Sequence, residues 1–290
     1  METGARGELV SDLARLIIDR ERGVATLTLN RPGVANAIDI SLARSLMEAS
    51  IACDEDDSIR CVVITGAGRF FCAGGDIGGF AAAGDAIPFL LKEITAYLHM
   101  AIARLARMPK PLITAINGPV AGAGLSLAIL GDIALAARSA HFTPAYTAIG
   151  LSPDGGSTWL LPRLVGLRRA QELILTNKRV GAEEAAALGL VTRVVEDDAL
   201  ASEAAALADQ LAASATFALG KTRHLLLSSF NSSIEAQMEA EACAIADASR
   251  TRQGRERINA FVATRKSNTD RIFDHDNNTR CIKQDLDHDS

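Results

Sequence analysis

A chain of 290 residues, 48% of them hydrophobic, is able to bury a large core, and this excludes disorder throughout. Thirty basic and 35 acidic residues leave a net charge of −5, which argues against a broad nucleic-acid surface. No uninterrupted apolar run approaches the roughly 18–20 residues of a membrane helix, and the N-terminus lacks a signal-peptide pattern. The five cysteines show no C-x-x-C spacing, which indicates reduced thiols rather than disulfides or a zinc site. We therefore expect a cytoplasmic protein with no metal, no nucleic-acid partner and no membrane partner.

Strand and helix patterns alternate from residue 16 to about residue 195. Alternating polarity and short apolar runs predict strands at Leu16–Asp19, Val24–Leu29, Cys61–Thr65, Leu112–Ile116 and Ile133–Ala137. Helical spacing and capping residues predict helices from Asp39 or Ser41 to about Cys53, over about 86–107, and from the Asn117-Gly118-Pro119 turn to about Leu130. This alternation is typical of an α/β fold.

The pattern becomes wholly helical after about Ala199, with helices predicted over Leu200–Leu211, Thr216–Leu227, Glu235–Ser249 and Gly254–Arg265. The last 23 residues hold six acidic, three basic and only five apolar side chains, so a disordered tail is expected there. We therefore divide the chain into an N-terminal extension (1–14), an α/β core (15–198), a C-terminal helical region (199–266) and a tail (267–290).

Two glycine-rich segments each follow a predicted buried strand. The first is Arg69–Ile77, with the sequence RFFCAGGDI, and the second is Ile116–Gly124, with the sequence INGPVAGAG. Small residues at such corners let another molecule approach backbone N–H groups. If the two corners converge, their amides form an oxyanion hole, which binds a carbonyl oxygen as it gains negative charge. The alternative is that the small residues only permit close packing of helix on strand.

Taken together, these segments resemble the crotonase (enoyl-CoA hydratase/isomerase) superfamily over about residues 15–266. The resemblance rests on four segments in order: Leu29–Ala37, Phe71–Asp76, Pro109–Gly124 and Gly150–Gly166. It implies a crotonase-like spiral of ββα units, a C-terminal helical trimerisation region, and homotrimers or hexamers. It also implies an acyl-CoA thioester substrate with no separate cofactor, since coenzyme A enters as part of the substrate. Carried over by position, the oxyanion-hole amides belong to Ala73 and Ala123.

The residues that carry out chemistry differ from those of the hydratases in this superfamily. The two glutamates of the hydratases fall on Ser126 and Tyr146, whose side chains are poor bases near neutral pH. A carboxylate is present instead at Asp154, in Ser-Pro-Asp-Gly-Gly, a form that looks like the phenylacetate-pathway isomerases acting on epoxyphenylacetyl-CoA. We expect Asp154 to be the catalytic acid/base. The alternative is that it caps the helix predicted at Ser157–Leu161.

The resemblance also implies residues that contact the substrate: Ala37, Ala73, Gly74, Gly75, Asp76, Tyr146, Phe261, Arg265 and Lys266. The last two lie beside the position where the family carries a lysine, which here is Thr264. A pocket lined by Phe80, Phe89, Tyr146 and Trp159 is expected around Asp154. His99, beside Tyr97 and Met100 in a long predicted helix, is expected to be a packing or surface histidine.

The leading hypothesis is an acyl-CoA isomerase that moves a double bond, or opens a ring epoxide, by enolate stabilisation and proton transfer through Asp154. One alternative is an enoyl-CoA hydratase with an atypical base, which would add water to its substrate. The other is an acyl-CoA-binding protein without catalytic activity, which would exchange no proton of the acyl group with solvent.

Overall fold

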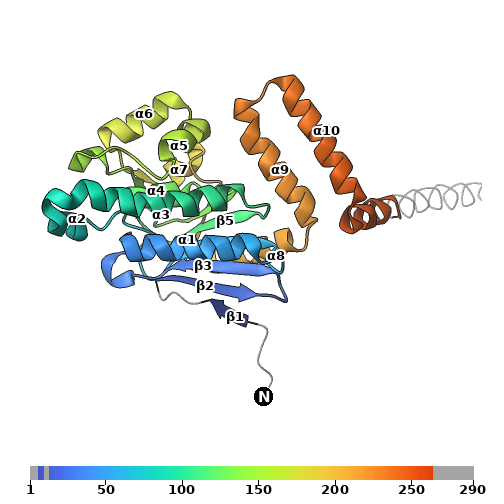
Figure 1. Cartoon of the computed structure of the whole chain (residues 1–290), viewed down its shortest axis with the longest axis horizontal. Helices are drawn as coiled ribbons and strands as arrows, with labels where there is room; N and C mark the ends of the chain where they lie inside the picture. Colours follow the sequence, from blue (N-terminus) through green and yellow to red (C-terminus); the bar gives the residue numbers. More distant parts are fainter. Residues whose placement is uncertain (1–5, 10–12, 264–290) are drawn as a thin grey trace, which may run out of the picture. The chain divides into compact units, whose positions relative to one another are not determined.

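The computed structural model describes residues 6–9 and 13–263. Its main feature is a seven-stranded sheet with the strand order β1-β2-β3-β4-β5-β7-β10 (Figure 1). The strands are β1 (Arg6–Leu9), β2 (Ala14–Asp19), β3 (Val24–Leu29), β4 (Cys61–Gly66), β5 (Leu112–Ile116), β7 (Ile133–Ala137) and β10 (Arg193–Val195). The first three pair antiparallel, and from β3 to β10 all neighbours are parallel. Strand β1 extends the sheet from within the predicted N-terminal extension.

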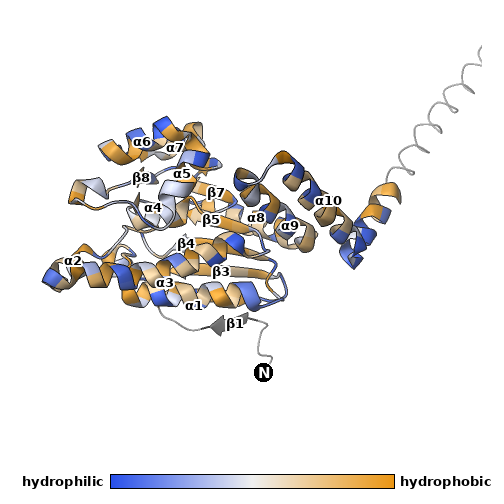
Figure 2. Cartoon of the chain, turned by 45° about the horizontal axis from the view of Figure 1, so that its top comes forward, coloured by the Kyte–Doolittle hydropathy of each residue, from blue (hydrophilic) through white to orange (hydrophobic). Residues whose placement is uncertain are grey.

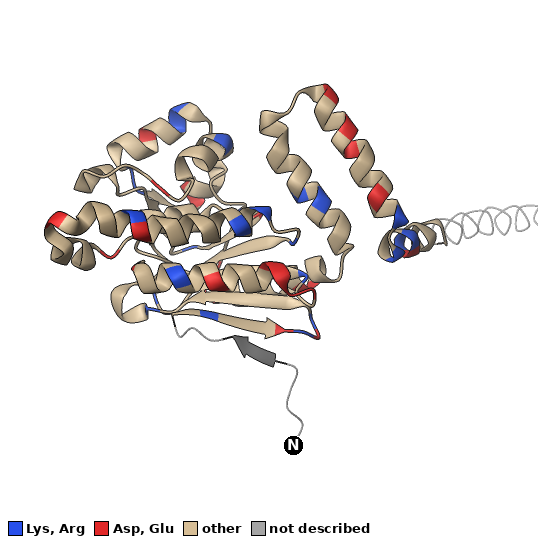
Figure 3. Cartoon of the chain, viewed as in Figure 1, with Lys and Arg blue, Asp and Glu red and all other residues tan. Residues whose placement is uncertain are grey.

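The central strands are buried because they are almost entirely apolar. Strands β3, β4, β5 and β7 contain no charged residue (Figures 2 and 3). All five residues of β5 are buried. Such continuous apolar runs are expected of parallel strands covered on both faces. The thiols of Cys53, Cys61 and Cys72 are free and buried, and burial raises the pKa of each to about 12.

A second, three-stranded sheet contains β6 (Val120–Ala121), β8 (His141–Thr143) and β9 (Val180–Gly181). Each of its first two strands follows a strand of the large sheet, as in β5–β6 and β7–β8, so the chain turns from one sheet into the other. These strands of two or three residues were not predicted, since they are too short to show a periodic pattern.

Long helices cover the large sheet. Asp39 begins α1 by accepting a hydrogen bond from the Leu42 amide at 2.8 Å, as the sequence predicts. Helix α1 contacts α3, and α8 lies along β3, β4, β5 and β7 (Figure 1). The α-helices up to residue 228 are α1 (Ile40–Glu55), α2 (Ile77–Ala83), α3 (Ile87–Arg107), α4 (Ala123–Ala128), α5 (Ser157–Val165), α6 (Leu167–Thr176), α7 (Ala182–Leu188), α8 (Leu200–Ala212) and α9 (Thr216–Ser228).

The chain forms two compact units, residues 1–227 and 228–290. The predicted C-terminal helical region is therefore divided, because α8 and nearly all of α9 belong to the first unit. Arg223 of α9 shows why: its buried guanidinium pairs with Asp132 at 2.6 Å and donates to the carbonyl of Leu105 at the end of α3. Within its described part, the second unit holds α10 (Ile234–Arg250) and a helix over residues 252–263. The predicted tail lies outside the described residues.

One stretch, Ile77–Arg107, is long and apolar enough to cross a membrane, with a mean hydropathy of 1.3. The stretch contains Asp85, Lys92 and Glu93, so it is not the uninterrupted apolar run whose absence the sequence analysis noted. Core helices of globular domains also meet the criterion of length and hydropathy, and this stretch contains the break between α2 and α3. Five residues of α3 are buried in the core: Ile94, Leu98, Ala101, Ile102 and Leu105. We therefore interpret α3 as a core helix.

Candidate active site

The two glycine-rich segments meet at the carboxyl ends of β4 and β5. Cys72 forms a bridge with Val120, and its carbonyl accepts a hydrogen bond from the Ala121 amide at 2.9 Å. Gly74 has a φ of +93°, and a Cβ atom there would lie 2.8 Å from the carbonyl oxygen of Ala121. Glycine is thus required at this contact, both for its backbone conformation and for space. The predicted convergence of the two corners is observed.

The amides at this meeting point differ from the predicted pair in one position. The Ala73 amide donates to the carbonyl of Ala35 at 3.0 Å, which contradicts its assignment to the oxyanion hole. Gly75 forms a parallel bridge with Ile38, and the bonds of that bridge use Gly74 O and Asp76 N.

Because successive amides of an extended chain point to opposite sides, the Gly75 N–H points away from Ile38. Ala123 is the first residue of α4, where an N–H group has no acceptor within the helix. Both residues line the cavity described below. Gly75 and Ala123, in place of the predicted pair Ala73 and Ala123, are therefore the candidates for the two oxyanion-hole amides.

A cavity of about 300 Å³ lies beside these amides. Its wall is mostly apolar and comes from the two corners, from α2 and α3, and from the segment between β8 and α5. It is lined by Ile38, Ala73, Gly75, Ile77, Phe80, Leu91, Ile94, Thr95, Leu98, Gly122, Ala123, Ala145, Tyr146, Ile149, Leu151, Ser152 and Asp154. Such a cavity fits an uncharged organic group.

Asp154 supplies the carboxylate of this cavity. Its Oδ1 accepts a hydrogen bond from the Tyr146 hydroxyl at 2.5 Å, and its Oδ2 lies 3.9 Å from Nε2 of His99. The Asp154 side chain is 26% exposed. Burial, followed by the negative charge of Asp154, raises the pKa of Tyr146. Tyr146 therefore stays protonated at neutral pH and serves as a hydrogen-bond donor.

Comparison with known proteins identifies the family. A family profile described as enoyl-CoA hydratase/isomerase matches residues 19–271. A 1,2-epoxyphenylacetyl-CoA isomerase of Escherichia coli K12 is 42% identical over 247 residues, covering 84% of this chain and 94% of that protein. This chain belongs to the enoyl-CoA hydratase/isomerase family. The crotonase resemblance and the crotonase-like fold predicted from the sequence are thus confirmed.

Other members of the family are named for different reactions. A 4-chlorobenzoyl coenzyme A dehalogenase of an Arthrobacter species is 37% identical over 234 residues, covering 77% of this chain and 82% of that protein. The crystal structure of an enoyl-CoA hydratase from Polaromonas sp. JS666 aligns with a TM-score of 0.80 at 33% identity, covering 90% of this chain and 98% of that one. Membership of the family therefore makes this chain an enzyme acting on acyl-CoA, and the choice of reaction depends on the site.

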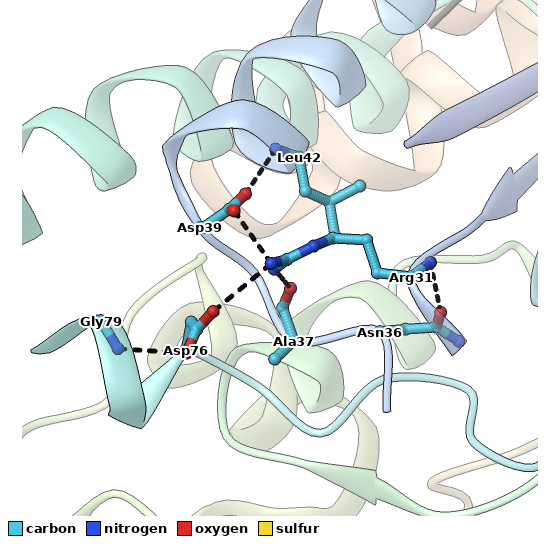
Figure 4. Close-up of polar contacts among 7 residues, drawn as sticks. All are labelled: Arg31, Asn36, Ala37, Asp39, Leu42, Asp76 and Gly79. Atoms are coloured by element: carbon cyan, nitrogen blue, oxygen red, sulfur yellow. Dashed lines mark hydrogen bonds and ion pairs between the residues drawn. The ribbon is translucent and has the colours of Figure 1, made fainter. Parts of the chain in front are cut away.

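Two predicted substrate-binding residues, Asp76 and Ala37, lie outside the cavity and contact Arg31 (Figure 4). Asp76 begins α2 by accepting a hydrogen bond from the Gly79 amide at 3.1 Å, and it pairs with Arg31 at 3.4 Å. Arg31 also pairs with Asp39 at 3.0 Å and donates to the carbonyl of Ala37. In this structure Asp76 and Ala37 therefore hold the starts of α1 and α2 together, and neither lines the cavity.

Part of the predicted lining is wrong. Phe80 and Tyr146 line the cavity, but Phe89 is 73% exposed and Trp159 stacks against the Arg163 guanidinium on the surface of α5. Phe261 lies in the second unit, and Arg265 and Lys266 lie outside the described residues. The contacts of these last three with coenzyme A stay predictions.

Sequence analysis missed His99. This residue of α3 accepts a hydrogen bond from the Gly155 amide at 3.0 Å and faces Asp154. The helical spacing of α3 gives no signal for this contact, because its partner lies 56 residues away in the chain. Within the described ranges, no group of three His, Cys, Asp or Glu side chains is arranged to hold a metal ion.

Proposed function

We propose that this enzyme is an acyl-CoA isomerase in which Asp154 moves a proton along the acyl group. The observation that carries the proposal is a single carboxylate in the cavity: among the described residues that line it, only Asp154 has a carboxylate side chain. Its Oδ1 is bound by Tyr146, which leaves Oδ2 to exchange a proton. A proton shift needs one group that removes and returns a proton, whereas the two-glutamate hydration needs two.

The proposed reaction conserves all atoms. The amides of Gly75 and Ala123 bind the thioester oxygen, which makes the adjacent carbon chain acidic. Asp154 removes a proton from the allylic carbon, and the C–H electrons pass to the thioester oxygen as a dienolate. The protonated Asp154 then returns the proton two carbons away. With a ring epoxide, Asp154 removes a proton from the carbon beside the thioester, the freed electron pair breaks the neighbouring epoxide C–O bond, and the protonated Asp154 gives that proton to the epoxide oxygen.

The wall of the cavity supports an acyl group that is hydrocarbon or aromatic. Ile77, Phe80, Leu91, Ile94 and Leu98 form its apolar side, where a charged acyl terminus would lose hydration without gaining a partner. The 42% identity to a 1,2-epoxyphenylacetyl-CoA isomerase supports the same conclusion. We include compact aromatic or epoxidised ring thioesters among the proposed substrates.

A panel of acyl-CoAs in deuterated buffer tests this function. With a β,γ-unsaturated or ring-epoxide thioester, we expect a conjugated or ring-opened isomer of the same formula, with deuterium in the molecules for which the protonated Asp154 exchanged with solvent before returning the proton. A product that has gained one water would show a hydratase, and bound thioester without deuterium uptake would show a binding protein. Either result contradicts the proposal.

We also propose that the second unit joins copies of the chain into a trimer or hexamer. Large apolar side chains are exposed along it: Phe230, Ile234, Met238, Ile245, Ile258, Phe261 and Val262. Ile234, Met238 and Ile245 occupy one face of α10 at positions i, i+4 and i+11. Exposed apolar surface of this kind is typical of a protein interface.

Charges on that face should dissociate the oligomer. We expect the double variant Met238→Glu, Ile245→Glu to run as a monomer in light scattering at a concentration where the wild type is a trimer or hexamer, because the charges lose hydration in the interface. Ala240→Glu places a charge on the opposite side of α10 and should leave the mass unchanged. A monomeric wild type would contradict the proposed assembly.

A further inference from the structure

The peptide unit between Asp154 and Gly155 is held at both ends. Its carbonyl oxygen accepts hydrogen bonds from Ser126 Oγ at 2.9 Å, from Ser157 Oγ at 2.9 Å and from the Ser157 amide at 3.2 Å. Its N–H group donates to Nε2 of His99 at 3.0 Å. This peptide carries the backbone of the proposed base, so these contacts determine where the carboxylate points.

The contact with His99 depends on the charge of the imidazole. Nε2 can accept the Gly155 N–H only while it carries a lone pair, which requires the neutral ring with its proton on Nδ1. A protonated ring has N–H groups on both nitrogens, so it cannot accept this bond. Its Nε2–H would instead face the Asp154 Oδ2, which lies 3.9 Å away.

We propose that His99 is a charge-sensitive positioning residue for Asp154. In its neutral form it holds the peptide that presents the carboxylate to the cavity. When it gains a proton it releases the Gly155 amide and pairs with Oδ2, the oxygen that exchanges a proton with substrate. The inference rests on the proposed function, since it takes Asp154 as the base.

The surroundings of His99 make Asp154 the group that responds to its charge. Asp154 Oδ2 is the described ionisable partner of His99, with the Tyr146 phenol behind it on Oδ1. The side chains one turn away on the same face of α3 are uncharged, as are those that contact the same peptide: Thr95, Ala96, Ile102, Ala103, Ser126 and Ser157. The imidazole is 51% exposed, so solvent protons reach it directly.

Two replacements of His99 distinguish its hydrogen bond to the Gly155 peptide from its response to protonation. In His99→Gln the side-chain carbonyl can accept the Gly155 amide but does not gain charge between about pH 5 and 8. We expect kcat at neutral pH within about threefold of wild type, and a smaller loss of kcat on acidification. In His99→Leu we expect kcat about tenfold below that of wild type at neutral pH with KM unchanged, about the value of one hydrogen bond, and a smaller deficit on acidification, where the wild type also loses this contact. Met100→Gln, which changes an exposed neighbour on α3, is the matched control and should leave the pH profile of the wild type unchanged.

The inference is overturned if His99→Gln loses as much kcat on acidification as the wild type does, or if it loses as much kcat at neutral pH as His99→Leu.

The ¹⁵N shifts of His99 in the resting protein give a readout that needs no turnover. We expect an unprotonated Nε2 at neutral pH, and a shift of the Gly155 amide as the ring gains a proton. If both are seen while Asp154→Asn isomerises normally, the proposed function fails and the charge-dependent contact stands. If Asp154→Asn is inactive but the Gly155 amide does not respond, this inference fails and the proposed function stands.

Discussion

Replacing Asp154 by asparagine should lower kcat for isomerisation by about 10²–10⁴-fold, the usual contribution of a general acid/base. The amide has nearly the shape of the carboxylate, and its oxygen can still accept the Tyr146 hydroxyl, so the fold and the KM should change little. The loss arises because an amide cannot take up the proton from the allylic carbon. Initial rates with a β,γ-unsaturated acyl-CoA, together with deuterium uptake from solvent, measure it.

Asp85→Asn is the matched control, because it makes the same chemical change at an exposed position in the turn between α2 and α3. It should keep the activity and the melting temperature of the wild type. If Asp154→Asn keeps its rate while still binding acyl-CoA, Asp154 is only a residue of the turn before α5 and the proposed mechanism is wrong. If both variants lose activity equally, the loss is not specific to the cavity.

Much of the site could be predicted from the sequence because its residues lie in short, ordered segments. Asp154, Ala123 and Tyr146 were all predicted and all line one cavity. The error at Ala73 has a simple cause, since the amides of Ala73 and Gly75 would point to the same side in a regularly extended chain, and the φ of +93° at Gly74 breaks that regularity. A shift of two residues, from Ala73 to Gly75, leaves the motif unchanged and changes which bond each amide makes. Which of the two amides faces the cavity is decided only by the pairing of this segment with Ala35 and Ile38 in the folded chain.

The remaining gaps arise from contacts between distant parts of the chain. Helix α2 has two glycines and no buried residue, so its sequence shows no apolar periodicity. In the sequence, Arg223 is one polar residue of a predicted helix, yet its ion pair with Asp132 spans 91 residues and joins α9 to the core. The contact of His99 with Gly155 likewise joins residues that are distant in the sequence. Local patterns predict where elements begin and end, whereas the partner of a single polar side chain depends on the fold.

Asn36→Ala should cause the largest loss of stability among the changes considered. The Asn36 side chain is fully buried and binds the loop that leads to the oxyanion hole. Its Nδ2 donates to the carbonyls of Phe70 at 2.8 Å, Ala67 at 3.0 Å and Phe71 at 3.1 Å. Its Oδ1 accepts a hydrogen bond from the Arg31 amide at 2.8 Å, as Figure 4 shows. Alanine would remove the side-chain partner of each of these backbone groups, of which the Phe70 carbonyl keeps a 3.5 Å bond from Asn117. Buried groups without partners cost about 1–3 kcal/mol each.

We expect the free energy of unfolding to fall by about 3–5 kcal/mol, less than the sum of the four bonds because water can reach part of the vacated space. Urea unfolding followed by circular dichroism measures this loss of stability.

The φ of Asn36 is +56°, so part of the cost is the left-handed backbone, which alanine adopts less readily. Asn177→Ala is the control for that part, because Asn177 has a φ of +50° and a described side-chain bond to Thr147 alone. We expect it to cost about 1–2 kcal/mol. Equal losses in the two variants would show that the backbone conformation, and not the bonds to the loop, accounts for the buried asparagine.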